Sequence, residues 1–180
     1  IGAKFVISSI EKKEGTRTPA APFTTSTLQQ EAARKLRLSV SQTMSIAQRL
    51  YESGLITYMR TDSTNLSSLA INTAKQYICN SFGEEYSQVR QYKTKAKRAQ
   101  EAHEAIRPTY IENVSIEGTP QEKKLYELIW KRTVASQMTD ARILRTDIKV
   151  SSDKGEENFN VQASQILFDG FLKLYFEGSD

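Results

Sequence analysis

Apolar residues recur at helical spacing through the middle of the chain. Ser26 and Gln29 have the spacing of a capping box, and leucine or alanine then recurs every fourth residue, which predicts a helix from Ser26. Ser39 and Gln42 repeat the capping pattern, and Gly54 is placed to end the helix that follows. The residues that we expect on the inner face of this second helix are Val40, Met44, Ala47 and Tyr51.

Two later segments have the same period. Residues 68–80 predict a third helix. Thr119, Pro120 and Glu122 form the strongest helix start in the chain, because they supply a cap, a proline at the first position and a glutamate that closes the box. The side chains expected to face inward are Ala70, Ala74, Tyr77 and Ile78 in the earlier helix, and Leu125, Leu128, Ile129 and Arg132 in the later one.

The remaining segments before the last helix are short or irregular. Residues 4–10 predict a strand with Phe5 and Ile7 on one face, whereas the charged and threonine-containing residues 11–22 indicate a linker. An apolar run at 55–59 predicts a short strand. Residues 82–97 have no clear period and indicate a loop, and 101–106 predict a short helix that a proline stops.

The C-terminal part of the chain alternates between apolar and polar positions. Apolar and polar residues alternate over 144–150 and again over 159–163, and the turn residues 153–155 between them predict a β-hairpin. Residues 166–168 and 171–176 predict further strand. The order of elements therefore predicts an α+β protein in which a helical block is inserted between terminal strands that pair with each other.

Composition and charge narrow the function only slightly. The chain has 180 residues and a formal net charge of +4, which permits binding to a polyanion without requiring it. Basic residues gather at Lys93, Lys95, Lys97 and Arg98, which indicates either a solvated loop or an edge that contacts phosphates. No apolar stretch is long enough to span a bilayer, and one cysteine with one histidine argues against a zinc site.

The strongest candidate for chemistry is Tyr58. It lies in Gly-Leu-Ile-Thr-Tyr-Met-Arg-Thr-Asp-Ser over residues 54–63, where Arg60 follows the tyrosine by two positions. A phenol can attack a phosphodiester, and a guanidinium can stabilise the charge on the phosphoryl oxygens with two donors. From these residues alone, an aromatic side chain that packs in a strand is the commoner explanation.

Three segments, 22–31, 54–65 and 100–109, resemble the bacterial type IA DNA topoisomerases in the same order. The first is Pro-Phe-Thr-Thr-Ser-Thr-Leu-Gln-Gln-Glu, which is more similar to topoisomerase I than to topoisomerase III or reverse gyrase. The third is Gln-Glu-Ala-His-Glu-Ala-Ile-Arg-Pro-Thr. The resemblance implies an ATP-independent isomerase that cuts one DNA strand through a 5′-phosphotyrosine link, passes a strand, reseals the break and relaxes negative supercoils.

The resemblance also implies a domain organisation. Residues 25–139 would form a mainly helical, winged-helix-like catalytic domain, inserted between β-strands of a β-rich arch, or gate, domain at 1–24 and 140–180. The family cleaves DNA between its tyrosine and a separate acidic domain, which holds Mg²⁺. This chain has no such acidic cluster and no G-x-x-x-x-G-K-[ST] loop for ATP phosphates, so it resembles a fragment of the whole enzyme.

The resemblance assigns roles to individual residues. Tyr58 would be the nucleophile, Arg60 would stabilise and bind the scissile phosphate, and His103 would contact the phosphate. Arg107 would either hold the DNA backbone or support the site. Glu101 and Glu104 would support the site, and a solvated helix face explains these two glutamates equally well. Further DNA contacts are expected from Thr61, Asp62, Lys93, Lys95 and Lys97.

The expected partners follow from the same resemblance. We expect single-stranded DNA and the acidic Mg²⁺-binding domain of the same protein as partners, no membrane, no metal bound by the fragment, and a location in the bacterial cytoplasm with the nucleoid. The fragment, compatible with a monomer, would bind single strands weakly and would not relax DNA.

Other readings stay open on the residues alone. A non-catalytic winged-helix module would bind duplex DNA and read bases in the major groove. A structural piece whose helices only pack against the rest of the parent protein is a further possibility. Two other classes of DNA enzyme do not fit the sequence: tyrosine recombinases place the tyrosine after R…H-x-x-R, whereas Tyr58 precedes His103, and relaxases need paired histidines for a metal, whereas the chain has one histidine.

Overall fold

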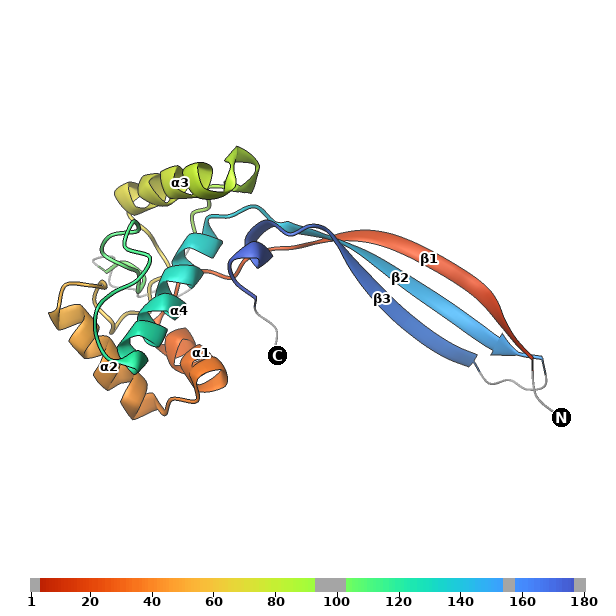
Figure 1. Ribbon diagram of the computed structural model, residues 1–180, viewed down its shortest axis with the longest axis horizontal. Helices are drawn as coiled ribbons and strands as arrows, with labels where there is room; N and C mark the ends of the chain where they lie inside the picture. The colour runs from red at the N-terminus through yellow and green to blue at the C-terminus, as the bar shows by residue number, and fades with distance from the viewer. Residues whose placement is uncertain (1–3, 93–102, 154–157, 177–180) are drawn as a thin grey trace. The chain divides into compact units, whose positions relative to one another are not determined.

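The computed structural model describes residues 4–92, 103–153 and 158–176, and the chain separates into two compact units (Figure 1). Unit 1 consists of Ile1–Thr18 and Asp140–Gly170, and unit 2 consists of Pro19–Thr139 and Phe171–Asp180. The prediction that strands from the two ends of the chain pair with each other is confirmed within unit 1.

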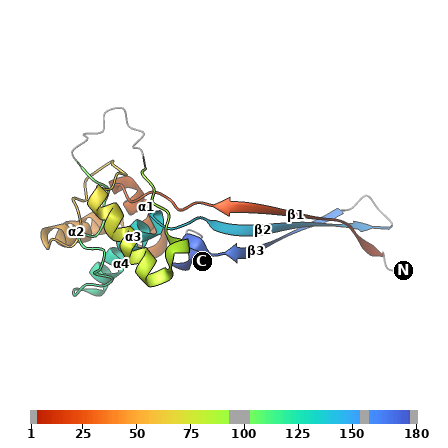
Figure 2. The same ribbon diagram turned by 90° about the horizontal axis from the view of Figure 1, so that it is seen from above.

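Unit 1 is an antiparallel sheet in the order β1-β2-β3 (Figures 1 and 2). Its strands are β1 (Phe5–Arg17), β2 (Ala141–Ser152) and β3 (Asn158–Phe168). Ile10 pairs with Ile148, and Ile148 pairs with Val161, so these three apolar residues share one face of the sheet. The predicted hairpin is therefore confirmed, whereas residues 154 and 155 of its predicted turn lie outside the described residues.

The first strand is much longer than its apolar pattern predicts. Residues 11–17 belong to β1, so the prediction of a linker there is wrong. The backbone of this part pairs with β2 from Glu11 opposite Asp147 to Arg17 opposite Ala141. Because these hydrogen bonds do not depend on side-chain polarity, and because most side chains of β1 are exposed, the strand continues without apolar alternation.

Unit 2 is helical. Its helices are α1 (Thr25–Leu36), α2 (Val40–Glu52), α3 (Ser68–Phe82) and α4 (Pro120–Ser136), with a short 3₁₀ helix, η1 (Glu84–Tyr86). A second 3₁₀ helix, η2 (Gly170–Lys173), begins at the last residue of unit 1 and continues into unit 2. The predicted caps of α2 and α4 are confirmed as complete capping boxes. The first cap is wrong by two residues, because Thr24 and Thr27 form the box of α1 in place of Ser26 and Gln29.

Helix α4 carries much of the core. Tyr126, Ile129 and Trp130 are each at most 2 % exposed. The helix contacts α1 and α2, and the Trp130 ring packs edge-on against Tyr77 of α3 at 5.4 Å. Among the described residues, the buried apolar side chains other than Ala141 all belong to unit 2.

The inner face of α2 differs from the predicted one. Ala47 is buried as expected, but Val40 and Tyr51 are 57 % and 42 % exposed. The residues that the helix buries are Thr43, Ile46, Ala47 and Leu50. The buried face is therefore rotated from the predicted one, and Tyr51 is left at the surface.

Three further predictions of secondary structure are wrong. Residues 55–59 form no strand and pair only through an isolated bridge between Ile56 and Pro108. The described part of the expected helix, 103–106, is not helical and has an isolated bridge between Ile106 and Phe23. Residues 171–176 belong to η2 and a turn, and Phe171 is buried in unit 2. Tertiary contacts decide all three, so the local pattern did not reveal them.

The capping box of α4 gives a prediction about acid stability. Glu122 accepts hydrogen bonds from Arg49 Nε at 2.7 Å and from the Thr119 backbone N–H at 2.8 Å. These bonds, with the arginine the larger cause, lower the pKa of Glu122 from 4.5 to about 2. A carboxyl group whose pKa is lower in the folded state stabilises the protein at pH values above its unfolded-state pKa. This contribution is lost as the pH falls from about 4.5 towards 2. We expect the melting temperature of Glu122→Gln to change less over this range than that of the unsubstituted protein.

Thermal unfolding at a series of pH values checks this expectation. Glu127→Gln is a matched control, because Glu127 also lies on α4 and pairs with Lys131 at 2.7 Å, with its side chain about half exposed. A Glu122→Gln profile with the same acid dependence as the control would contradict the role of this carboxylate.

Candidate active site

The segment that carries Tyr58 has no helix or strand of its own. Gly54, with a φ of 71°, turns the chain out of α2, and residues 57–67 are irregular until α3 begins. The backbone N–H groups of such a segment need partners from elsewhere in the fold. Thr57 donates its N–H to the Arg107 carbonyl at 2.9 Å, and Thr109 donates to the Leu55 carbonyl at 3.0 Å.

The same segment is joined to the start of α1. Thr25 donates its backbone N–H to the Thr61 carbonyl at 2.9 Å. The segment before α1 in turn contacts residues 103–109, which we call the histidine segment because they include His103. The Ile106 backbone N–H donates to the Phe23 carbonyl at 2.8 Å. Three stretches that are far apart in sequence, around residues 23–25, 55–61 and 105–109, therefore lie side by side.

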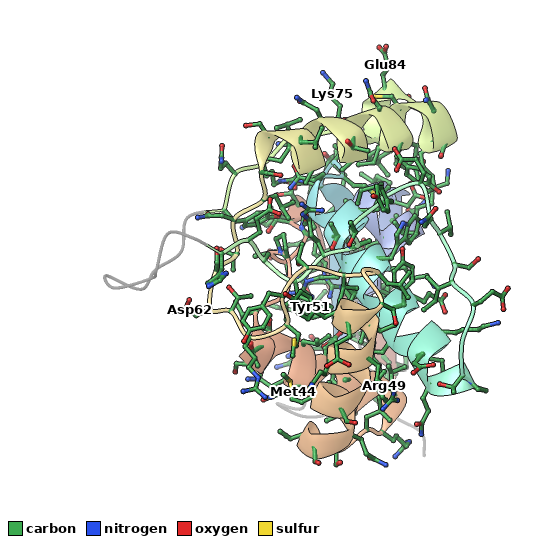
Figure 3. All side chains as sticks on the ribbon, turned by 90° about the vertical axis from the view of Figure 1, so that its left-hand side faces the viewer. Met44, Arg49, Tyr51, Asp62, Lys75 and Glu84 are labelled. Atoms are coloured by element: carbon green, nitrogen blue, oxygen red, sulfur yellow. The ribbon has the colours of Figure 1, made fainter. Side chains whose placement is uncertain are left out.

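A surface cleft of about 670 Å³ opens where these stretches meet. Tyr58 is 37 % exposed in this cleft, so its phenol is accessible from the surface. Figure 3 labels Tyr51 at the end of α2 and Asp62 on the loop beyond it. The residues that line the cleft are Thr24, Thr25, Ser26, Tyr58, Arg60, Thr61, Asp62 and His103.

Two other rings hold the Tyr58 ring. Tyr51 lies edge-on to it, with ring centroids 5.3 Å apart, and His103 lies at 5.6 Å in a tilted arrangement. Aromatic pairs at these separations are favourable. These two ring contacts restrict the position of the Tyr58 side chain, and the rest of its surface stays open to the cleft.

Arg60 and Asp62 lie in the cleft with exposed side chains. Within residues 4–92, 103–153 and 158–176, no ion pair joins Arg60 to Asp62. A guanidinium in an open cleft beside a phenol can bind an anion with two donors.

Arg107 is held quite differently. Its guanidinium donates to Glu104 Oε2 from Nε at 3.0 Å and to the Pro108 carbonyl at 2.9 Å, and its side chain is only 14 % exposed. Glu104 also accepts the N–H of Ser67, the N-cap of α3. Burial raises the pKa of Glu104, but the bonds from Ser67 and Arg107 outweigh it and hold the pKa below its usual value. Of the two roles expected for Arg107, these contacts favour support of the site.

Thr61 and Ser63 stabilise the loop after Tyr58. The Thr61 hydroxyl accepts the N–H of Ser63 at 3.0 Å, and the Ser63 hydroxyl accepts the N–H of Asn65 at 3.1 Å. Thr61 is 8 % exposed, so its side chain serves mainly the turn, although it lines the cleft.

Some predicted site residues cannot be placed, and others were missed. Lys93, Lys95 and Lys97 lie outside the described residues. Among the residues that the structure describes, no group of three or more histidine, cysteine, aspartate or glutamate side chains is placed to hold a metal ion. The cleft residues to which the sequence assigned no role in the site are Thr24, Thr25 and Ser26. Their signal was present, because they belong to the motif at 22–31.

No helix in the described parts of the chain is long and apolar enough to cross a bilayer.

Comparison with known proteins gives one consistent result. A family model described as DNA topoisomerase matches residues 1–180. DNA topoisomerase 1 of Mycolicibacterium smegmatis is 53 % identical over 193 residues, which cover 99 % of this chain and 20 % of that protein. The prokaryotic-type DNA topoisomerase 1 of Acanthamoeba polyphaga mimivirus is 48 % identical over 188 residues, which cover 99 % of this chain and 22 % of that protein.

A solved structure agrees with this similarity. The structure of full-length topoisomerase I from Thermotoga maritima superposes with a TM-score of 0.83 at 39 % identity, over 97 % of this chain and 30 % of that one. The chain therefore spans about a fifth of the length of the curated relatives.

Proposed function

The chain belongs to the DNA topoisomerase family, as a segment of a bacterial type IA topoisomerase I, and from this premise we propose that Tyr58 is its DNA-cleaving nucleophile. The observation that carries the proposal is the open cleft in which the exposed Tyr58 phenol lies with Arg60 and His103. A reactive hydroxyl beside a cationic donor and an imidazole suits attack on a phosphodiester of single-stranded DNA.

The proposed step exchanges one ester for another. The phenolic oxygen of Tyr58 forms a bond to phosphorus while the bond from phosphorus to the 3′-oxygen breaks. The phenol loses a proton and the 3′-oxygen gains one, so charge and protons balance. The product is a 5′-phosphotyrosine and a free 3′-hydroxyl, and the reverse step reseals the strand without ATP because the ester bond energy is retained.

The residues around Tyr58 would each have a separate role in DNA cleavage. Arg60 would grip the scissile phosphate and stabilise its developing charge, because its guanidinium is exposed in the cleft. His103, whose ring contacts Tyr58, would donate a hydrogen bond to the same phosphate. Thr61 and Asp62 would border the bound strand. Arg107 would act through its bonds to Glu104, by holding the histidine segment in place.

The basic segment would extend the DNA contacts. Lys93, Lys95 and Lys97 would neutralise backbone phosphates beyond the cleft, because clustered lysines bind polyanions without reading sequence.

The remaining machinery would come from the rest of the protein. An acidic domain that holds Mg²⁺ would face this cleft, and the described residues of this chain do not themselves fit a metal site. Unit 2 would be the winged-helix-like catalytic domain, and unit 1 would be part of the arch that gates DNA passage. The whole enzyme would relax negative supercoils in the bacterial cytoplasm, at the nucleoid.

An end-labelling experiment tests the proposed cleavage. The full-length protein is incubated with a single-stranded oligonucleotide and Mg²⁺, the reaction is stopped with detergent, and the protein is separated on a denaturing gel. We expect a label at the 3′ end of the DNA to remain on the protein and a label at the 5′ end to leave it. Retention of the 5′ label instead would contradict the proposed 5′-phosphotyrosine.

The 180-residue fragment is the natural control. It should bind the oligonucleotide, more weakly as the salt concentration rises, yet yield no adduct. An adduct formed by the fragment alone would contradict the proposed division of labour between this chain and the acidic domain.

A further inference from the structure

Two threonine hydroxyls flank the Tyr58 segment and bond only to backbone groups of neighbouring segments. Thr25 lies in the first turn of α1, and Thr57 directly precedes Tyr58. Both are partly buried. Neither is accounted for by the roles assigned above to Tyr58, Arg60 and His103.

Thr25 brackets Arg60. Its Oγ1 donates to the Met59 carbonyl at 2.8 Å and accepts the Thr61 N–H at 2.9 Å. These groups belong to the peptide units before and after Arg60. One side chain therefore fixes the backbone on both sides of the arginine.

Thr57 makes the same pattern with the histidine segment. Its Oγ1 donates to the Ala105 carbonyl at 2.7 Å and accepts the Arg107 N–H at 3.0 Å. Since Ala105 follows His103 by two residues, this hydroxyl links the backbone next to Tyr58 to the backbone next to His103.

We propose that Thr25 and Thr57 are positioning residues that hold Arg60, Tyr58 and His103 in register for attack on the DNA phosphate. The inference rests on the proposed function and deepens it. The observation that supports it is a repeated geometry: each hydroxyl donates to one backbone carbonyl and accepts the N–H of the residue two positions later.

The physical reason lies in the absence of regular structure. Residues 57–67 have no helix or strand to fix their backbone, although the reacting groups must be aligned closely. A threonine suits this task because its branched Cβ restricts χ1, and its hydroxyl can donate and accept at once. The two hydroxyls thus replace the hydrogen bonds that a sheet would provide.

The test compares four variants of the full-length protein. Thr25→Val and Thr57→Val remove each hydroxyl at nearly constant volume, whereas Thr25→Ser and Thr57→Ser keep it. Single-turnover formation of the adduct with a single-stranded oligonucleotide gives a rate and a final amplitude for each. Thr73→Val is the matched control, because the Thr73 hydroxyl also donates to a backbone carbonyl, that of Leu69, but lies on α3 and does not line the cleft.

The expected result separates alignment from folding. Both valine variants should form the adduct about 10-fold to 100-fold more slowly, with near-normal amplitude and DNA affinity, because alignment changes the transition state. The serine variants should recover most of the rate, and Thr73→Val should match the unsubstituted protein.

Other results would overturn the proposal. Valine variants that react at the normal rate, or that lose amplitude in parallel with a lower melting temperature while the rate is unchanged, would leave the two threonines a purely structural role. An unsubstituted protein that forms no adduct would overturn the proposed function, and this inference with it.

Discussion

Tyr58→Phe in the full-length protein is expected to abolish the covalent protein–DNA adduct completely. The substitution removes only the phenolic oxygen, and the ring contacts with Tyr51 and His103 can persist. Because that oxygen is the atom that would bond to phosphorus, no neighbouring group can replace it. Affinity for single-stranded DNA should change little. The adduct is measured on a denaturing gel, and the affinity by fluorescence anisotropy.

Tyr51→Phe is the matched control for this prediction. It removes the same atom from a ring 5.3 Å away, which is also partly exposed. This variant should form the adduct as the unsubstituted protein does. An adduct that persists in Tyr58→Phe, or one that is lost in Tyr51→Phe alone, would move the nucleophile to another residue.

Arg60→Ala has the second largest expected effect. Loss of one preorganised donor to a developing anion typically costs about 10²-fold to 10³-fold in rate, and we expect that loss in single-turnover cleavage. The cleavage rate of Arg60→Lys should lie between those of Arg60→Ala and the unsubstituted protein, because lysine keeps the charge but cannot present two parallel donors. DNA affinity should fall far less than the rate, since only one phosphate contact is removed.

Lys75→Ala separates this effect from a general loss of positive charge. Lys75 is exposed on the outer side of α3 and does not line the cleft (Figure 3). Its removal should leave the cleavage rate unchanged. Equal rate losses in Lys75→Ala and Arg60→Ala would indicate that bulk charge is responsible, and would contradict the role assigned to Arg60.

Local signals in the sequence predicted the helices well. The boxes that start α2 and α4 depend on residues three positions apart, so the sequence shows them directly. The N-cap of α1 was missed by two residues because Thr24 with Thr27 and Ser26 with Gln29 have the same spacing. The tertiary bond from the Thr25 N–H to the Thr61 carbonyl accompanies the observed choice.

The conformations of the sheet and the loops depend on backbone partners that are distant in sequence, and the local pattern of apolar and polar residues does not show these partners. Residues 11–17 are charged and still form strand, because β2 supplies hydrogen bonds along their whole length. Residues 55–59 include apolar side chains and still form no strand, because their backbone pairs, among the described residues, only with the irregular segment 107–109, through an isolated bridge between Ile56 and Pro108. Periodicity reports which side chains are buried, and it does not report which backbone groups pair: Ile56 and Met59 are buried without belonging to a strand.

The site was predicted in its main residues but not in its supports. The motifs singled out Tyr58, Arg60, Asp62 and His103, which share one cleft in the structure. The parts played by Thr25 and Thr57 could not be foreseen, because their partners are backbone atoms 34 to 50 residues away.

The most direct test of the account is to identify the amino acid that carries the DNA. The adduct is trapped in detergent, digested with nuclease and protease, and analysed by tandem mass spectrometry. A peptide that spans residues 50–60 contains both Tyr51 and Tyr58, so fragmentation must assign the modified ring. We expect a 5′-phosphonucleotide on Tyr58 and none on Tyr51; a nucleotide on any other side chain would contradict the assignment of Tyr58 as the nucleophile.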